Sequence, residues 1–231
     1  MRKKIFIITF LLIGLHFMNQ ISLSHSMWIT IKNYKLKVGE ETSYFIGYGH
    51  KYLSPEHWVM NLERNYWNIF KKATLIDPDG VKLILKPAKG SGKFMVKKEG
   101  VYILGVKSER KAGEPYGPSG KYAKAIIQVG KKDKGFSHFF GHRIEIIPLE
   151  NPAKIKPGDY LTVKIIFEGK PLSTFVYATY ADFKPEKDAF PIMAKSNQEG
   201  IAKIKISNKG EWLIYVNHKV DYSAVLTFEV N

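Results

Sequence analysis

The most constraining feature of this sequence is a repeated alternation of apolar and polar residues along short segments. Successive side chains of a β-strand point to opposite faces, so a period of two is typical of strands with one buried face. The segments are rich in β-branched and aromatic residues and are bounded by Gly, Pro, Asn or Asp. They read WITIKNYKLKV, VKLILKP, VYILGVKS, AKAIIQVG, RIEIIPL, YLTVKIIFEG, FVYATYADF, IAKIKIS, EWLIYVNH and AVLTFEV. The pattern predicts an all-β protein, and the spacing of its turns favours β-sandwiches.

A proline-rich segment, PLENPAKIKPGD at residues 148–159, separates two blocks of these strands. Proline cannot donate a hydrogen bond to a β-ladder, so this composition is typical of a linker or a domain edge. We therefore predict two β-sandwich domains, at residues 25–147 and 148–231. The second is expected to be immunoglobulin-like or transthyretin-like.

Residues 1–24 have the organisation of a signal peptide. Basic residues at positions 2–4 precede an apolar run that is too short for a stable membrane span. Small residues at Ser22 and Ser24 match the pattern that signal peptidase reads, which predicts cleavage before His25 or a few residues to either side. The chain is therefore expected to be exported to the periplasm, with no transmembrane segment in its mature part.

The chain carries a formal net charge of +15 and contains no cysteine. Its lysines alternate singly with apolar residues in strand-like segments, which is typical of the solvated face of a sheet. This arrangement, together with export, argues against a nucleic-acid partner. Without cysteine, disulfides and thiolate metal sites are impossible, so a transition-metal site would have to be centred on imidazole.

Cleavage before His25 would give that residue two nitrogen donors, the imidazole ring and the free α-amine. Such donors suit Ni(II), Cu(II) and Zn(II), and the usual affinity order places copper above nickel. The donor set therefore does not name the metal. The alternative is an exposed terminal histidine without a role.

Three further histidines are candidate metal ligands. His50 follows the segment GYG at 47–49, whose glycines permit a close backbone approach or a positive φ. His57 lies in a stretch that could form a helical turn and could face the same place. His218 ends the segment EWLIYVNH, on the same face as its Trp, Ile and Val. Each also has an ordinary alternative: a loop histidine bonded to backbone, a surface residue, or a core histidine with one partner.

The sequence contains no enzyme signature. It has no nucleophile elbow, phosphate loop or HExxH motif, and its carboxylates are not paired in a way that suggests acid–base work. His138 and His142 flank FFG without fixed helical geometry, so the metal argument for histidines four residues apart on a helix fails. We expect the protein not to be an enzyme.

Five segments, HSMWI, GYGH, GHRIEIIPL, GKPL and GEWLIYVNH, together resemble the DUF4198 family. That family includes the NikM/NikK-like periplasmic components of nickel and cobalt uptake systems. The resemblance implies two β-sandwich domains in the bacterial periplasm and a role in delivering divalent nickel or cobalt to a membrane permease. It also implies that His25, His50 and His218 correspond to histidines that recur in the family.

These inferences combine into a hypothesis of a nitrogen-rich site for Ni²⁺ or Co²⁺, with Cu²⁺ and Zn²⁺ as open alternatives. The candidate ligands are His25, His50, His57 and His218. Tyr48 and Glu56 are the residues expected to orient the ligand rings.

Two other functions stay open. The protein could be an envelope β-sandwich that binds carbohydrate or a protein partner through the aromatic segment around Trp58, Tyr66 and Trp67. It could also be a periplasmic copper-handling protein, although the lack of methionine clusters argues mildly against Cu(I).

Overall fold

The computed structural model describes residues 26–49, 72–115, 117–184, 190–219 and 221–231. This part of the chain consists mainly of β-strands, with a short 3-10 turn at Pro152–Lys154. Within the described ranges, no helix is both long and apolar enough to cross a membrane. The predicted signal peptide and the possible helical turn near His57 lie outside the described residues.

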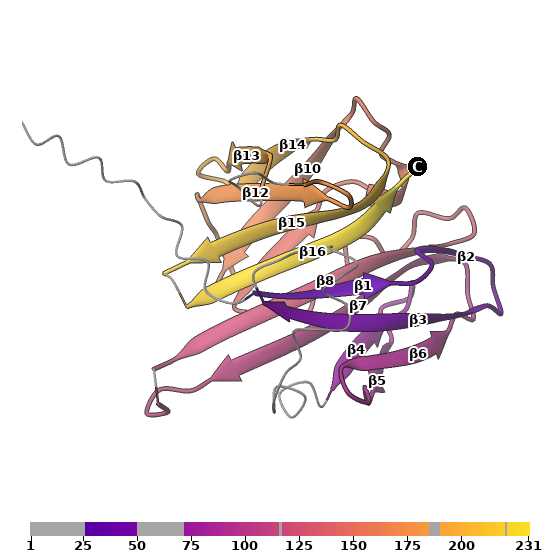
Figure 1. Cartoon of the computed structure of the whole chain (residues 1–231), viewed down its shortest axis with the longest axis horizontal. Helices are drawn as coiled ribbons and strands as arrows, with labels where there is room; N and C mark the ends of the chain where they lie inside the picture. Colours follow the sequence, from indigo (N-terminus) through magenta and orange to yellow (C-terminus); the bar gives the residue numbers. More distant parts are fainter. Residues whose placement is uncertain (1–25, 50–71, 116, 185–189, 220) are drawn as a thin grey trace, which may run out of the picture.

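The strands form three sheets (Figure 1). The largest, which we call the central sheet, runs in the order β13 (Ile192–Lys195), β12 (Phe175–Tyr180), β15 (Gly210–His218), β16 (Tyr222–Val230), β8 (Ser119–Val129), β7 (Gly100–Arg110), β4 (Ala73–Ile76) and β5 (Lys82–Leu85), with β2 (Lys35–Leu36) also paired to β8. The β1 sheet contains β1 (Ser26–Ile31), β3 (Glu41–Gly49) and β6 (Ser91–Met95). The β10 sheet contains β9 (Ile144–Pro148), β10 (Tyr160–Phe167), β11 (Lys170–Pro171) and β14 (Ile201–Lys205).

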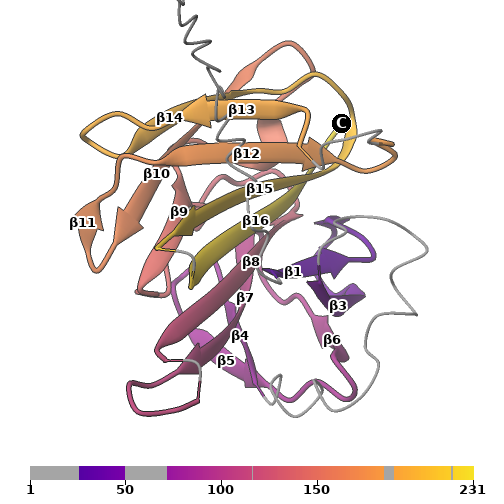
Figure 2. The same cartoon turned by 60° about the vertical axis from the view of Figure 1, so that its left-hand side comes forward.

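The central sheet lies between the other two sheets and has a hydrophobic core on each face (Figure 2). Alternate residues of β15 show the division. Leu213 and Tyr215 belong to the first core, shared with the β1 sheet, whereas Trp212 and Ile214 belong to the second core, shared with the β10 sheet. The prediction of an all-β fold built from β-sandwiches is confirmed, and the central sheet serves both layers.

Strands from the two halves of the chain meet inside the central sheet. β16 pairs in parallel with β8, from Tyr222 opposite Gly120 to Thr227 opposite Ala125. The predicted domain boundary, before residue 148, falls at the last residue of β9. The division into two domains stays a prediction, and strands from both sides of it share one sheet.

The hairpin between β4 and β5 shows how local sequence sets the strand ends. The Asp77 carboxylate accepts hydrogen bonds from the amides of Asp79 and Val81, each at 2.9 Å. Gly80 completes the turn with a φ of +85°, which a residue without Cβ adopts at little cost. This turn fixes the register that places Lys82 and Ile84 beside Ile76 and Thr74.

Candidate functional site

The pairing of β1 with β3 brings two segments of interest together. Ser26 lies opposite Gly49 at one end of the ladder, and Trp28 lies opposite Gly47. A Cβ at Gly47 would fall 2.1 Å from the Trp28 indole, so only glycine fits there. Gly49 has a φ of +150°, in the region that favours glycine. The two glycines therefore have the properties predicted from sequence, a close approach and a positive φ.

Four of the predicted site residues lie outside the described residues: His25, His50, Glu56 and His57. The structure does describe the chain neighbours of the first two. Ser26 and Gly49 follow and precede them, and these neighbours are partners across the ladder. Among the described residues, no group of three or more His, Asp or Glu side chains is arranged to hold a metal ion.

Tyr48, which was predicted to orient a ligand ring, lies on β3 opposite Met27. It lies on the same face of β3 as the buried residues Tyr44 and Ile46, and its half-buried side chain packs against the first core. Tyr48 therefore faces the central sheet close to the strand end where Ser26 and Gly49 meet.

His218 lies elsewhere. Its ring is 4.5 Å from the ring of Phe167, centroid to centroid, and burial lowers its pKa. Phe167 and Tyr222 pack against the second core, whereas Ser26 lies beside Tyr215 in the first. The central sheet thus separates His218 from the strand end formed by Ser26.

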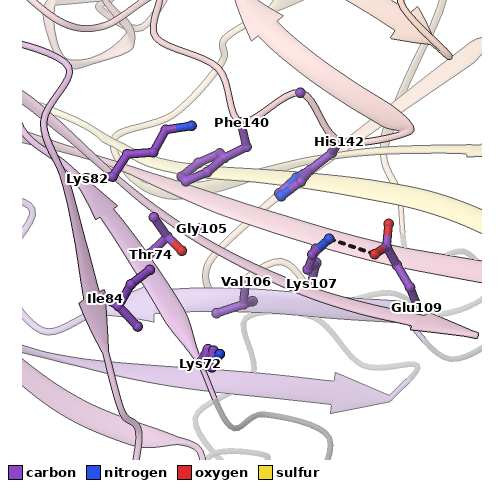
Figure 3. Close-up of a pocket in the computed structure, with 11 residues that line it drawn as sticks. Lys72, Thr74, Lys82, Ile84, Gly105, Val106, Lys107, Glu109, Phe140 and His142 are labelled. Atoms are coloured by element: carbon purple, nitrogen blue, oxygen red, sulfur yellow. Dashed lines mark hydrogen bonds and ion pairs between the residues drawn. The ribbon is translucent and has the colours of Figure 1, made fainter.

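A second candidate site is a groove of about 470 Å³ over β7, β4 and β5 (Figure 3). Its floor includes Gly105 and Lys107, which lie on the same face of β7 as Ile103 of the second core. Its wall is the loop that carries Phe140 and His142. The groove therefore lies where the second-core face of the central sheet continues beyond the β10 sheet.

The wall of the groove carries the stacked rings of Phe140 and His142, and the ring of Tyr122, which does not line the groove, stacks on His142. The ring of His142 lies 5.0 Å from that of Phe140, with an interplanar angle of 10°, and 4.8 Å from that of Tyr122. Burial lowers the pKa of His142 to about 4. The imidazole is therefore neutral near pH 7 and adds no charge to the groove.

A buried ion pair holds this wall in place. Lys124 and Glu145 are 2% and 1% exposed, and the Lys124 ammonium lies 2.9 Å from Glu145. The Glu145 carboxylate also accepts hydrogen bonds from the amides of Phe140, Gly141 and His142, at 2.9, 3.0 and 3.1 Å. Burial acts to raise the pKa of Glu145, but the ammonium and the amides outweigh it and keep the carboxylate ionised.

The floor depends on a missing side chain. A Cβ at Gly105 would fall 2.4 Å from the ring of Phe140, so the aromatic ring occupies the space above a glycine. Because Gly105 pairs with Thr74 on one side and Lys124 on the other, this close approach lies beside the buried ion pair. The loop and the sheet therefore fit together through one glycine and one carboxylate.

The groove is positively charged. Lys72, Lys82 and Lys107 line it, and the Lys107 ammonium lies 2.7 Å from Glu109, which also accepts a hydrogen bond from the Tyr122 hydroxyl at 2.7 Å. Neither Lys72 nor Lys82 forms an ion pair with another described residue. Three lysines and one glutamate leave two positive charges, so the groove suits an anion.

The groove is not predictable from the local sequence pattern. One feature of the sequence did point to it. Lys124 lies on the same face of β8 as Tyr122 and Ile126, and a lysine within an apolar row requires a buried partner. The identity of that partner, Glu145, depends on how the β10 sheet packs, which the local pattern does not contain. The lysines that line the groove looked like ordinary solvated positions for the same reason.

Several solved structures resemble the chain at low identity. The D0–D1 domain of intimin is 15% identical, with a TM-score of 0.27, over 87% of this chain and 96% of that one. Fibronectin(III)-like modules of CbhA from Clostridium thermocellum are 10% identical, with a TM-score of 0.26, over 88% and 94% of the two chains. The Escherichia coli adhesin FdeC is 12% identical, with a TM-score of 0.28, over 89% of this chain and 62% of that one. At these TM-scores the likenesses do not bear on function.

No curated protein matches the sequence. A family model described as a domain of unknown function, DUF4198, matches residues 22–220. The match begins before β1 and includes every strand up to β15. It therefore covers most of the chain, and this protein belongs to the DUF4198 family.

Proposed function

We propose that this protein is an exported periplasmic component that binds a divalent metal ion, nickel or cobalt, and assists a membrane permease in its uptake. Two lines of support are its membership of DUF4198 and the resemblance of its histidine-containing segments to the NikM/NikK-like members. In this proposal the ion is cargo and the chain is a carrier.

The observation that carries the proposal is the pairing of Ser26 with Gly49. A chelate formed by His25 and His50 needs the two attachment points to lie side by side, and these two residues are those attachment points. The β1–β3 ladder and the Trp28–Gly47 contact hold them on a rigid sheet. After cleavage, His25 supplies a ring nitrogen and an amine, and His50 supplies a second imidazole.

His57 is the third ligand in this proposal, ahead of His218. In the structure, His218 contacts Phe167 on the opposite face of the central sheet from Ser26. His57 follows His50 by seven residues and can return to the same strand end. A site built from nitrogen alone suits Ni²⁺, with Co²⁺, Cu²⁺ and Zn²⁺ as competitors in the test.

The experiment is a titration of protein that begins at His25, using Ni²⁺, Co²⁺, Cu²⁺ and Zn²⁺ and monitored by calorimetry. One ion should bind per chain. Changing even an outer-shell partner weakens a metal site about 10–100-fold, so His25→Ala and His50→Ala should each weaken Ni²⁺ binding at least that much. Adding Ser-Gly before His25 removes the α-amine from the site and should also weaken binding.

The matched control is His138→Ala, because the His138 ring contacts the Pro78 carbonyl at 3.2 Å and lies outside the proposed set. This variant should bind Ni²⁺ like the parent. Unchanged affinity in both His25→Ala and His50→Ala would refute the metal site. If only the protein with Ser-Gly added before His25 kept the parent affinity, the result would refute the role of the α-amine but not the metal site.

A further inference from the structure

Three lysines line the groove from adjacent strands. Lys72 directly precedes β4, whose first residue Ala73 pairs with Val106, so Lys72 lies beside Lys107 on the same face. Lys82 comes from β5, and Figure 3 shows its side chain extending toward Phe140. Like charges on neighbouring strands destabilise a sheet unless an anion lies between them. Glu109 partly neutralises only Lys107.

The groove is also preorganised. Its wall is fixed by the Glu145 carboxylate, which binds three consecutive amides of the loop and the buried ammonium of Lys124. Its floor is a paired β-sheet. A site on rigid elements loses little conformational freedom when a ligand binds, which distinguishes this groove from a chance cluster of surface lysines.

The size and lining of the groove define the class of ligand. A volume of about 470 Å³ lies within the range of small-molecule sites. Phe140 and Ile84 supply an apolar surface, while Lys72 and Lys82 supply unpaired positive charge beside it. Since the three loop amides are already bonded to Glu145, the anion would be held mainly by ammonium groups.

We propose that this groove binds a small organic dianion with a planar ring, a ring dicarboxylate, whose ring packs against Phe140 and Ile84 and whose carboxylates contact Lys72 and Lys82. The site is separate from the strand end at Ser26 and Gly49 and does not depend on the proposed metal function. Lys107 stays paired with Glu109 and borders the site.

The test is a titration of the isotope-labelled full chain with benzene-1,3-dicarboxylate, followed by NMR. We expect saturable binding with a Kd of about 1 mM or below, given the size of the probe. Shifts should centre on residues 139–142 and on the His142 ring. The uncharged diamide of the same ring, and inorganic phosphate, should each bind at least about tenfold more weakly, since one lacks charge and the other lacks the ring.

The double variant Lys72→Gln/Lys82→Gln should weaken dicarboxylate binding at least about tenfold. The matched control, Lys35→Gln/Lys203→Gln, removes the same charge from exposed positions on other strands and should bind like the parent. Equal binding by the groove variant, shifts centred elsewhere, or no saturable binding would overturn the proposal. Phosphate binding as tight as that of the dicarboxylate would overturn the ring-containing ligand class.

Discussion

Each face of the central sheet holds a carboxylate shielded from water, Glu145 buried and Glu211 half-buried, and the two have different partners. Glu145, on the second-core side, pairs with the ammonium of Lys124 and with three loop amides. Glu211, at the start of β15 on the first-core side, accepts a hydrogen bond from the hydroxyl of Tyr34. Among the described residues, no cation pairs with Glu211.

The pKa values follow from this difference. Burial tends to raise the pKa of both acids. For Glu145, the ammonium and the amides outweigh burial and hold the pKa below its ordinary value. For Glu211, burial raises the pKa to about 7, and the hydrogen bond from Tyr34 opposes that rise without cancelling it. At Glu211 the phenol of Tyr34 therefore does not lower the pKa as the ammonium of Lys124 does at Glu145.

The largest expected effect comes from removing that cation. Lys124→Met keeps the length and apolar contacts of the side chain but leaves Glu145 buried without its ammonium. Breaking a buried pair in this way costs about 3–5 kcal/mol, and urea unfolding at pH 7 measures the loss. Lys203→Met, at an exposed position on β14, is the control and should stay within about 0.5 kcal/mol of the parent.

A second change tests whether the charge of Glu145 is responsible. Adding Glu145→Gln to Lys124→Met removes the unpaired charge and should recover part of the lost free energy of unfolding. A loss below about 1 kcal/mol in Lys124→Met, or no recovery in the double variant, would contradict the comparison between the two acids.

The next effect concerns Glu211 and pH. Its folded pKa of about 7 lies above the unfolded value of 4.5, so the folded state binds the proton more tightly. The contribution of this group to stability is therefore fully present below about pH 4.5 and is lost as pH rises toward about 7. Glu211→Gln resembles the protonated acid and keeps the acceptor for Tyr34.

We expect Glu211→Gln to match the parent at pH 4.5 and to be more stable by about 3 kcal/mol at pH 8. Urea unfolding across this range measures the difference at each pH. A constant difference between the two proteins would show that Glu211 titrates in the folded state as it does in the unfolded chain.

Much of the fold was predictable from sequence because strand alternation is a local property. The segments EWLIYVNH and AVLTFEV became β15 and β16, and the glycines at 47 and 49 had the predicted backbone properties, a close approach and a positive φ. Sharing of the central sheet was not predictable, because the parallel pairing of β16 with β8 joins residues about a hundred positions apart. The pairing of Lys124 with Glu145 was not predictable either, because it also depends on packing between separate strands.

The candidate site was predictable in part. The segment GYGH pointed to the end of β3, and the structure places that end beside the start of β1. For His218, alternation along EWLIYVNH predicted the correct face of β15, that of Trp212 and Ile214. The sequence did not indicate that β1 would cover the other face of β15. The separation of His218 from Ser26 follows from the packing of the three sheets, so it was not predictable.

The smallest effect separates the phenol from the carboxylate on the first-core side. Tyr34→Phe removes the hydroxyl that donates to Glu211 and leaves the buried ring in place. A hydrogen bond to a neutral acid contributes about 1 kcal/mol, and one to an ionised carboxylate about 2 kcal/mol. The loss of stability should therefore be about 1 kcal/mol at pH 5, where Glu211 is protonated, and about 2 kcal/mol at pH 8.

Tyr44→Phe, at a buried tyrosine whose pKa is raised by burial alone, is the control and should show no such dependence on pH. If the loss in Tyr34→Phe were equal at both pH values, the phenol would not be sensing the charge of Glu211, and the contrast with the Lys124–Glu145 pair would rest on burial alone.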